Sequence, residues 1–213
     1  MFVRDRMTAN PVTTTEDTLV FDALKLMQET NVRRLPVVRK GRLVGIVTES
    51  ELLRISPSPA TSLSVFELNY LLSQLRVKDA MTKDVVTVSP DTTVEEAAIL
   101  MRDNAVSGLP VLENDNLIGI ITETNIFDAF VELMGIRRAG TRLTVSVVDR
   151  PGVIAALSSI IRDLGVNIIS MATFFPTEEE SHIVIRLSTK EPEPVVEALT
   201  AAGYDVVNVR ILN

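Results

Sequence analysis

The chain has 213 residues, 46% of them hydrophobic and 23% charged, a balance typical of globular proteins with well-filled cores and a length that predicts more than one folding unit. Its formal net charge of −7 disfavours nucleic acid and anionic membranes as partners, because both repel an acidic protein. Cysteine is absent and His182 is the only histidine, which excludes disulfides, thiolate metal sites and most histidine-based catalysis. With no apolar run of membrane-spanning length and no signal-peptide core at residues 1–7, we expect a cytoplasmic location.

An internal repeat organises most of the chain. Residues 3–53 align without a gap with residues 77–127, and 21 of the 51 aligned pairs are identical. Two copies are too few for a solenoid, so we expect a duplicated unit whose copies pack on each other.

Each copy is predicted to fold as β-α-β-β-α. In the first copy a short β-prone stretch (12–14) precedes a helix whose apolar residues recur at helical spacing from Val20 to Met27. Strands at 35–38 and 43–48 follow, joined by a turn at Lys40-Gly41, and a last helix begins after Thr48. The second copy repeats this order, with its turn at 114–116 and its last helix after Thr122.

The helix starts carry capping signals. Thr92 and Glu95 predict a capping box in the second copy, and Thr18 is the predicted cap in the first. Between the copies, a Ser-Pro-Ser-Pro breaker at 56–59 precedes apolar residues at helical spacing from Leu63 to Leu71. We interpret this connector helix as a cover for exposed core.

The pattern changes at Gly140. Strands are predicted at 141–148, 168–175, 182–187 and 206–212, with helices after Pro151 and Pro192. This β-α-β-β-α-β order is the ferredoxin-like arrangement, so the whole chain is predicted to be α+β. The predicted boundaries are 1–55 for the first repeat, 56–76 for the connector, 77–135 for the second repeat and 140–213 for the last domain.

One part of each repeat is suited to binding an anion. Thr48 and Thr122 end a strand where a helix begins, so a hydroxyl and free amides can receive a phosphate there. Glu51 can accept hydrogen bonds from a ribose diol, and Arg33 and Arg34 can reach a polyphosphate. The second copy has Asn125, Ser107 and Gly108 at these positions, so two unequal clefts are expected. The alternative is that both threonines are N-caps and Glu51 only interacts with the helix dipole.

The paired units resemble CBS domains in tandem, a Bateman module. The resemblance rests on a Met-Thr opening, a Leu-Pro-Val strand and a Gly-Ile-x-Thr ending before a helix, each present twice. It implies an adenosine ligand between the copies, such as AMP, ADP, ATP, S-adenosylmethionine or NAD. Where the family has Asp three residues after the hydroxyl, this chain has Glu51 and Asn125, which weakens the expectation for the second copy. The predicted nucleotide-binding residues are Thr13, Arg33, Arg34, Val37, Thr48, Glu51, Thr87, Val111, Thr122 and Asn125.

The last domain resembles an ACT domain in its Asp149-Arg150-Pro151-Gly152-Val153 loop and in the Asn167-Ile168 strand start. The resemblance implies an amino acid at this loop, with Asp149 taking its ammonium group. The predicted contacts are Asp149, Gly152, Val153, Asn167 and Ile168. The alternative is a proline-glycine turn with a purely structural role.

The whole chain is similar to the acetoin utilization protein B family, which implies a regulator connected with acetoin or acetyl-CoA metabolism. No nucleophile-base pair, metal-binding spacing or glycine-rich phosphate loop is recognisable, so no catalytic residue, metal or required cofactor is predicted. We therefore expect a non-catalytic sensor that couples its ligand state to a client protein the sequence does not identify. A ligand-free dimerisation scaffold is the alternative, an enzyme is the third hypothesis, and a homodimer is expected in both leading cases.

Overall fold

The computed structural model describes residues 1–56, 74–177 and 180–212. It contains two compact units, Met1–Phe127 and Asp128–Asn213, and helix α5 (Glu123–Leu133) runs across the boundary between them. The predicted connector helix from Leu63 to Leu71 lies outside the described residues.

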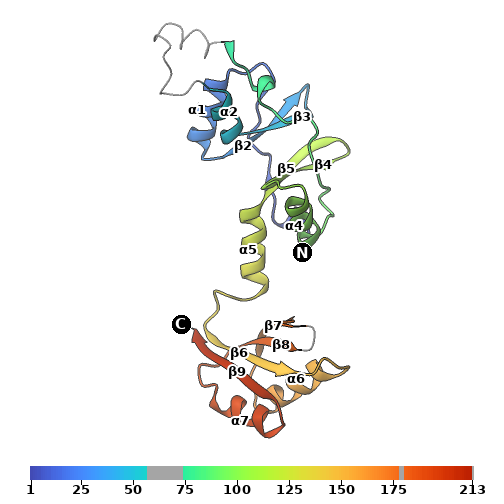
Figure 1. Ribbon diagram of the computed structural model, residues 1–213, viewed down its shortest axis with the longest axis vertical. Helices are drawn as coiled ribbons and strands as arrows, with labels where there is room; N and C mark the ends of the chain where they lie inside the picture. Colours follow the sequence, from blue (N-terminus) through green and yellow to red (C-terminus); the bar gives the residue numbers. More distant parts are fainter. Residues whose placement is uncertain (57–73, 178–179, 213) are drawn as a thin grey trace. The chain divides into compact units, whose positions relative to one another are not determined.

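Both repeats have the predicted helices and hairpins (Figure 1). The first repeat contains α1 (Val20–Thr30), β2 (Arg34–Arg39), β3 (Arg42–Thr48) and α2 (Glu49–Ile55). The second contains α4 (Val94–Asp103), β4 (Gly108–Glu113), β5 (Asn116–Thr122) and α5. The two-residue turns at Lys40-Gly41 and Asn114-Asp115 have positive φ at both positions, as tight hairpins require. The predicted strands at 12–14 and 86–88 reduce to single parallel bridges, Thr14 to Val37 and Val88 to Val111.

The predicted helix caps are wrong by one residue. Helix α4 is capped by Thr93, whose hydroxyl accepts from the Glu96 amide while the Glu96 carboxylate accepts from the Thr93 amide. The Thr92 hydroxyl accepts from the Ser89 amide, and its carbonyl accepts from the Val3 amide. In the first repeat the Thr18 hydroxyl accepts from the Thr15 amide, and the N-cap of α1 is Leu19, which makes no side-chain cap. In both repeats, therefore, the predicted threonine belongs to the turn before the helix.

The repeats exchange their N-terminal arms. The first arm contains the short 3-10 helix η1 (Val3–Asp5) and β1 (Thr8–Ala9), and β1 pairs with β5 of the second repeat. The second arm contains η2 (Val77–Asp79), and its Thr82 bridges to Ile46 on β3 of the first repeat.

The exchange also divides the two cores of this unit. Val3 is fully buried in the cluster that contains Val88 and Met101, while Val77 is fully buried in the cluster that contains Val20 and Leu52. Each repeat therefore completes the core of the other.

Two glycines explain why the Met-Thr opening and the Gly-Ile strand occur together. A Cβ placed on Gly45 would lie 2.8 Å from Sδ of Met81, and a Cβ on Gly119 would overlap Sδ of Met7. The methionine of each arm thus packs directly on the glycine of the opposite strand, where any side chain would displace it.

The second unit contains an antiparallel sheet covered by two helices. Its elements are β6 (Gly140–Val147), α6 (Val153–Asp163), β7 (Ile168–Phe174), β8 (Ser181–Leu187), α7 (Glu193–Ala201) and β9 (Asp205–Leu212). The strand order is β7-β8-β6-β9, which confirms the ferredoxin-like arrangement.

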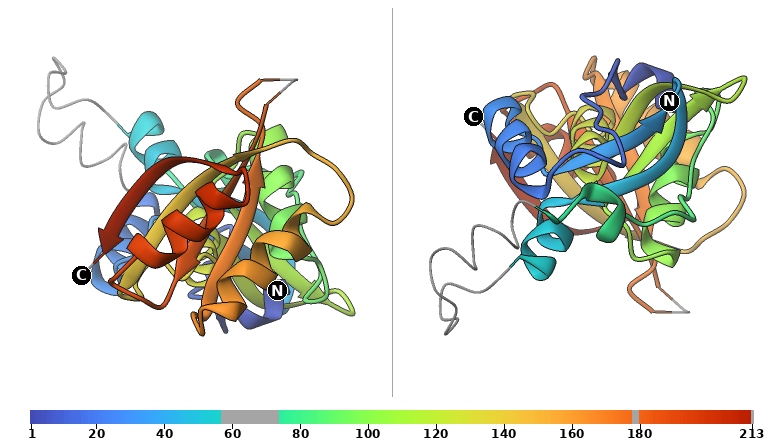
Figure 2. Two further views of the ribbon diagram at one scale, coloured as in Figure 1. Left: turned by 90° about the horizontal axis from the view of Figure 1, so that it is seen from below. Right: turned by 90° about the horizontal axis from the view of Figure 1, so that it is seen from above.

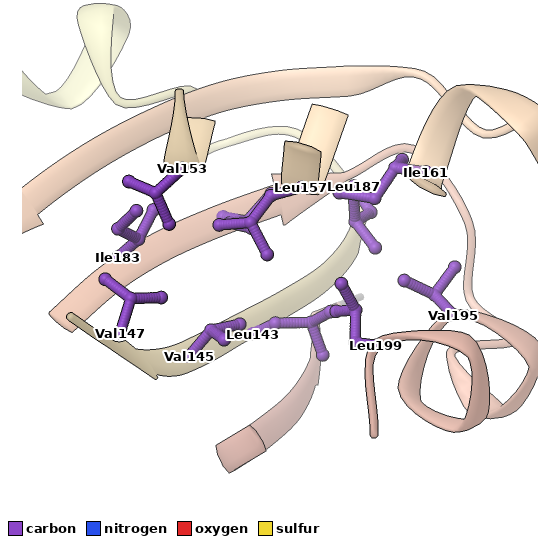
Figure 3. Packing of buried hydrophobic residues seen from close by; sticks show 11 residues of the cluster. Leu143, Val145, Val147, Val153, Leu157, Ile161, Ile183, Leu187, Val195 and Leu199 are labelled. Atoms are coloured by element: carbon purple, nitrogen blue, oxygen red, sulfur yellow. The ribbon is translucent and has the colours of Figure 1, made fainter. Parts of the chain in front are cut away.

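The two helices lie side by side on one face of this sheet (Figures 1 and 2). Alternate residues of β6 and β8, such as Leu143 and Ile183, point toward Leu157 of α6 and Leu199 of α7 and form the core (Figure 3). No helix in the described ranges is long and apolar enough to cross a bilayer.

Candidate functional site

A pocket of about 830 Å³ lies in the first unit and is lined by residues from both repeats. This volume is within the usual range of small-molecule sites. Its lining residues are Thr8, Asn10, Pro11, Val12, Asn31, Val32, Arg33, Arg34, Pro36, Thr48, Glu49, Ser50, Ser107, Ile120, Thr122, Glu123 and Thr124. Four of the ten predicted nucleotide-binding residues are therefore brought together: Arg33, Arg34, Thr48 and Thr122.

The two threonines lie at equivalent places in the two repeats, each at the junction of a strand and a helix. The Thr48 hydroxyl caps α2 by accepting from the Glu51 amide at 3.3 Å. The Thr122 hydroxyl lies 3.5 Å from the Asn125 amide at the start of α5. The N-cap interpretation of Thr48 is therefore confirmed, and both threonines also line the pocket.

Arg34 breaks the symmetry between the repeats. Its Nη2 donates to the Ser107 hydroxyl at 2.8 Å, and a Cβ on Gly108 would overlap its Nη1. Gly108 is the residue of the second repeat that aligns with Arg34. The Arg34 guanidinium therefore lies against the equivalent position of the other repeat. The pKa of Arg34 is lowered, mainly by burial of the guanidinium; the charge of Glu123 opposes this shift and the charge of Arg33 adds to it. The guanidinium stays charged at neutral pH.

Glu51 and Asn125 do not line this pocket and are engaged in the structure. Oε2 of Glu51 accepts from the Thr48 amide and hydroxyl, both at 2.7 Å, and Oε1 accepts from the Thr82 hydroxyl at 3.1 Å. Oδ1 of Asn125 accepts from the Thr122 amide at 2.9 Å and hydroxyl at 2.8 Å. The Glu51 carboxylate thus connects the strand-helix junction at Thr48 to Thr82 of the exchanged arm.

The other four predicted residues also lie outside the pocket lining. Val37 and Val111 are fully buried in the cores of the two repeats. Thr13 and Thr87 are half-buried next to the single bridges made by Thr14 and Val88.

Sequence reasoning missed the contribution of the exchanged arm. Thr8, Asn10, Pro11 and Val12 line the pocket because β1 crosses to β5. Their only sequence signal was the Met-Thr opening, which the repeat shows without indicating which strand it contacts.

The predicted amino-acid loop of the second unit divides into exposed and buried residues. Asp149, Gly152 and Asn167 are exposed, and Gly152 adopts a positive φ of 91° before α6 begins. Val153 belongs to the core, and its amide donates to the Arg150 carbonyl at 3.3 Å. Ile168 packs against the same core but pairs with Leu187, at the end of β8 opposite Ser181, the partner of Val147. The prediction that Asn167 and Ile168 lie beside Asp149 is therefore wrong within one chain, because β7 starts at the far end of the sheet. Within the described ranges, no group of three or more His, Cys, Asp or Glu residues is placed to hold a metal ion.

Comparisons with protein families match both parts of the chain. The CBS domain family model matches residues 3–58 and 77–132, and the TTHA0829-like ACT domain model matches residues 139–210.

Curated relatives match mainly through the repeats. The uncharacterized protein MJ1426 of Methanocaldococcus jannaschii is 32% identical over 155 residues, covering 62% of this chain and 92% of that protein. The CBS domain-containing protein YhcV of Bacillus subtilis is 28% identical and covers 67% of this chain and 92% of its own. An inosine-5'-monophosphate dehydrogenase of Korarchaeum cryptofilum is 36% identical over 59% of this chain but only 22% of its own length, and this match is confined to the CBS region.

Solved structures include similar pairs with ligands. CBSX2 in complex with AMP is 33% identical, with a TM-score of 0.52 over 64% of this chain and 98% of that one. The CBS domain pair of MJ0100, in complex with 5-methylthioadenosine and S-adenosyl-L-methionine, is 26% identical, with a TM-score of 0.51 over 61% of this chain and 95% of that one. A putative acetoin utilization protein (AcuB) from Vibrio cholerae is 29% identical, with a TM-score of 0.52 over 64% and 95%.

Proposed function

Because this chain belongs to the CBS domain family and ends in an ACT domain, we propose that it is a non-catalytic regulatory protein that binds an adenosine-containing nucleotide between its repeats. The observation that carries this proposal is the pocket in which Arg33 and Arg34 lie with Thr48 and Thr122. The two cations are suited to the phosphates of a nucleotide, while the two threonine hydroxyls, which donate to Glu51 and Asn125, fix the strand-helix junctions beside them. The complexes of similar pairs with AMP and with S-adenosyl-L-methionine support adenosine as the ligand class.

The two repeats have different parts in this site. Arg33 and Arg34 come from the first repeat, and the equivalent Ser107 and Gly108 supply no charge, so the phosphates bind on the first-repeat side. The ribose binds near Glu51, since a carboxylate holds a diol more strongly than the amide of Asn125. Thr13, Val37, Thr87 and Val111 complete the proposed set as supporting residues.

Binding is coupled to the arms. A ribose that takes over Oε1 of Glu51 releases the Thr82 hydroxyl, which belongs to the arm of the second repeat. A ligand that binds one arm position better than the other shifts the population toward it, and a client protein can read that change. Similarity to an acetoin utilization protein supports acetoin or acetyl-CoA metabolism as the setting.

The ACT domain has its own proposed ligand, an amino acid. Asp149 is exposed beside the Gly152 turn, where its carboxylate can receive an ammonium group. Gly152 and Val153 belong to the same loop and complete this proposed site, whereas Asn167 and Ile168 lie at the other end of the sheet, since Val147 pairs with Ser181 and Ile168 with Leu187.

A homodimer is part of the proposal. Large apolar side chains remain exposed on the helices of both repeats: Phe21 (63%) on α1, Leu53 (55%) on α2, Ile99 (57%) on α4 and Phe127 (69%) on α5. Apolar helix surfaces of this kind are typical of interfaces between protein chains. The same observation favours the second candidate function, a dimerisation scaffold that needs no ligand.

A thermal-shift panel separates the two functions. The probes are AMP, ADP, ATP, S-adenosylmethionine, NAD and the amino acids, and a ligand at one hundred times its dissociation constant stabilises the protein by about 2.7 kcal/mol. Arg33→Gln and Arg34→Gln should reduce the nucleotide shift, while Arg42→Gln, which removes the same charge outside the pocket lining, should not.

The scaffold has a different signature. A protein that shows no shift with any probe, yet has the mass of a dimer at micromolar concentration, contradicts the sensor and supports the scaffold. Asp149→Ala should reduce only a shift caused by an amino acid.

A further inference from the structure

Three arginines form a row across the sheet of the ACT domain. Arg142 on β6 is the direct cross-strand partner of Arg186 on β8 and of Arg210 on β9. Leu143 and Val145 of β6 point into the core beneath α6 and α7. Because side chains alternate along a strand, the arginine row lies on the opposite face, away from both helices.

Among the residues that the structure describes, this row has no acidic partner. Within the described residues, none of the three arginines forms an ion pair, although their domain contains nine carboxylates and only six cations (residues 140–213). By register, Asp205 is on the same face, but it pairs with Ser146, four residues along β6 from Arg142 and therefore about 13 Å away.

The guanidinium of Arg186 is incompletely satisfied. Its Nε and Nη1 are buried and have no hydrogen-bond partner among the described residues. Arg142 is only partly satisfied, since its Nη1 donates to the Thr144 hydroxyl at 2.9 Å. Burial, and next the charge of Arg142, lower the pKa of Arg186.

Such an arrangement is unfavourable without a ligand. Like charges directly opposite each other on neighbouring strands repel. A buried donor without an acceptor loses its hydrogen bonds to water and forms none in the protein, which costs the desolvation free energy of the group. Both costs are removed by an oxyanion that accepts from the guanidinium groups. A buried polar group without a partner in a folded protein requires an explanation, and a bound ion is one of the recognised ones.

We propose that the face of the ACT sheet opposite α6 and α7, where Ser170 beside Arg186 donates to the Met134 carbonyl, binds a small polyanion that carries two or more oxyanion groups, held by Arg142, Arg186 and Arg210. Neighbouring strands are about 4.8 Å apart, so adjacent guanidinium groups are spaced for adjacent acid groups of one molecule. The planar fork of arginine binds phosphate and carboxylate with paired hydrogen bonds. Arg142 is near the start of β6 and the loop from Asp149 to Val153 follows its end, so that loop is separate from the arginine row, whereas Ile168 pairs with Leu187 next to Arg186.

Calorimetric titration of the full chain tests this site. The protein carries Arg33→Gln and Arg34→Gln, which remove the arginines of the nucleotide pocket, and the probes are inorganic tripolyphosphate and citrate at fixed ionic strength. We expect at least one probe to bind, and Arg142→Gln or Arg186→Gln to weaken its affinity about tenfold or more, as expected for losing a charge-assisted hydrogen bond. Arg162→Gln is the matched control, because Arg162 is exposed on α6 and pairs with Asp163.

Each outcome decides the proposal. Binding of tripolyphosphate alone assigns a phosphate ligand, binding of citrate alone assigns a polycarboxylate, and binding of both supports the shared class. If neither probe binds at millimolar concentration, or if Arg162→Gln weakens binding as much as Arg186→Gln, the site is refuted. Arg186→Lys keeps the charge and most of the side chain. If this variant binds the probe more weakly but has an unchanged urea unfolding curve, the weaker binding is caused by the lost guanidinium contacts and not by unfolding.

Discussion

Replacing Gly108 with alanine tests the contact that makes the repeats unequal. A Cβ at this position would overlap Nη1 of Arg34 and lie 3.0 Å from its Cδ and Cζ. Gly108 does not have a positive φ, so its backbone accepts alanine and the cost arises from moving Arg34. The moved guanidinium loses its 2.8 Å hydrogen bond to Ser107, a partly buried and charge-assisted contact. We therefore expect Gly108→Ala to destabilise the first unit by about 1–2 kcal/mol.

A double-mutant cycle isolates this contact. With Arg34→Ala already present, the new methyl group meets no guanidinium, and Gly108→Ala should be neutral or stabilise by about 0.4–1 kcal/mol through the unfolded chain. The coupling energy between positions 34 and 108 should then exceed about 1 kcal/mol.

The measurement is urea unfolding followed by far-UV circular dichroism, since the chain has no tryptophan. Gly108→Ala combined with Arg33→Ala is the control and should be additive. Additivity within about 0.5 kcal/mol for the Arg34 pair would mean that the guanidinium does not occupy the space above Gly108.

Three further perturbations address the arms, the caps and the last sheet. Val3→Ala should cost about 2 kcal/mol and should speed amide hydrogen exchange in α4 before α1, because Val3 is buried in the core of the second repeat; equal acceleration of the two helices would contradict a local role. Thr93→Ala should cost about 1 kcal/mol in urea unfolding, as the loss of an N-cap does. Hydrogen bonds from the Thr93 amide, and next from its hydroxyl, hold the pKa of the Glu96 carboxyl below its usual 4.5. The stability that Glu96 contributes is therefore present above pH 4.5 and is lost as the pH falls through the lower folded-state pKa. Between pH 6 and pH 3, the melting temperature of Glu96→Gln should fall less than that of the parent. Gly140→Ala should lower the urea midpoint of the ACT domain relative to the parent protein, because the new Cβ would overlap the Leu187 carbonyl and Gly140 has a φ of 148°; an unchanged transition of that domain would show that the backbone shifts at no cost.

The elements that depend on local spacing could be predicted from the sequence. Apolar residues from Val20 to Met27 bury one face of α1, and the turn residues at Lys40-Gly41 and Asn114-Asp115 fix both hairpins, so short-range pattern and fold agree. The ferredoxin-like order was predicted for the same reason, since each strand and helix of the last domain has its own pattern.

The caps of α4 show where local pattern is insufficient. Thr92 and Thr93 are both capping residues, and both have a glutamate three residues later, so the sequence supports two registers equally. The choice is made by a distant contact, because the Thr92 carbonyl accepts from Val3 of the exchanged arm and the helix starts one residue later. For the same reason the pocket residues of the arm, Thr8 to Val12, could not be assigned before the partner strand was known.

The duplicated architecture itself requires the two repeats to differ at the centre. Arg42 on β3 pairs with its own counterpart Asn116 on β5, so equivalent positions of the two hairpins meet where the repeats join. Arg34 likewise lies over its counterpart Gly108, and a second arginine there would compete for the same space and bring two cations into contact. One large cation on one side therefore needs a small neutral residue on the other. A pair built in this way presents a charged side and an uncharged side to any ligand that enters between the repeats, which is why an anionic ligand should bind in one orientation and not in two.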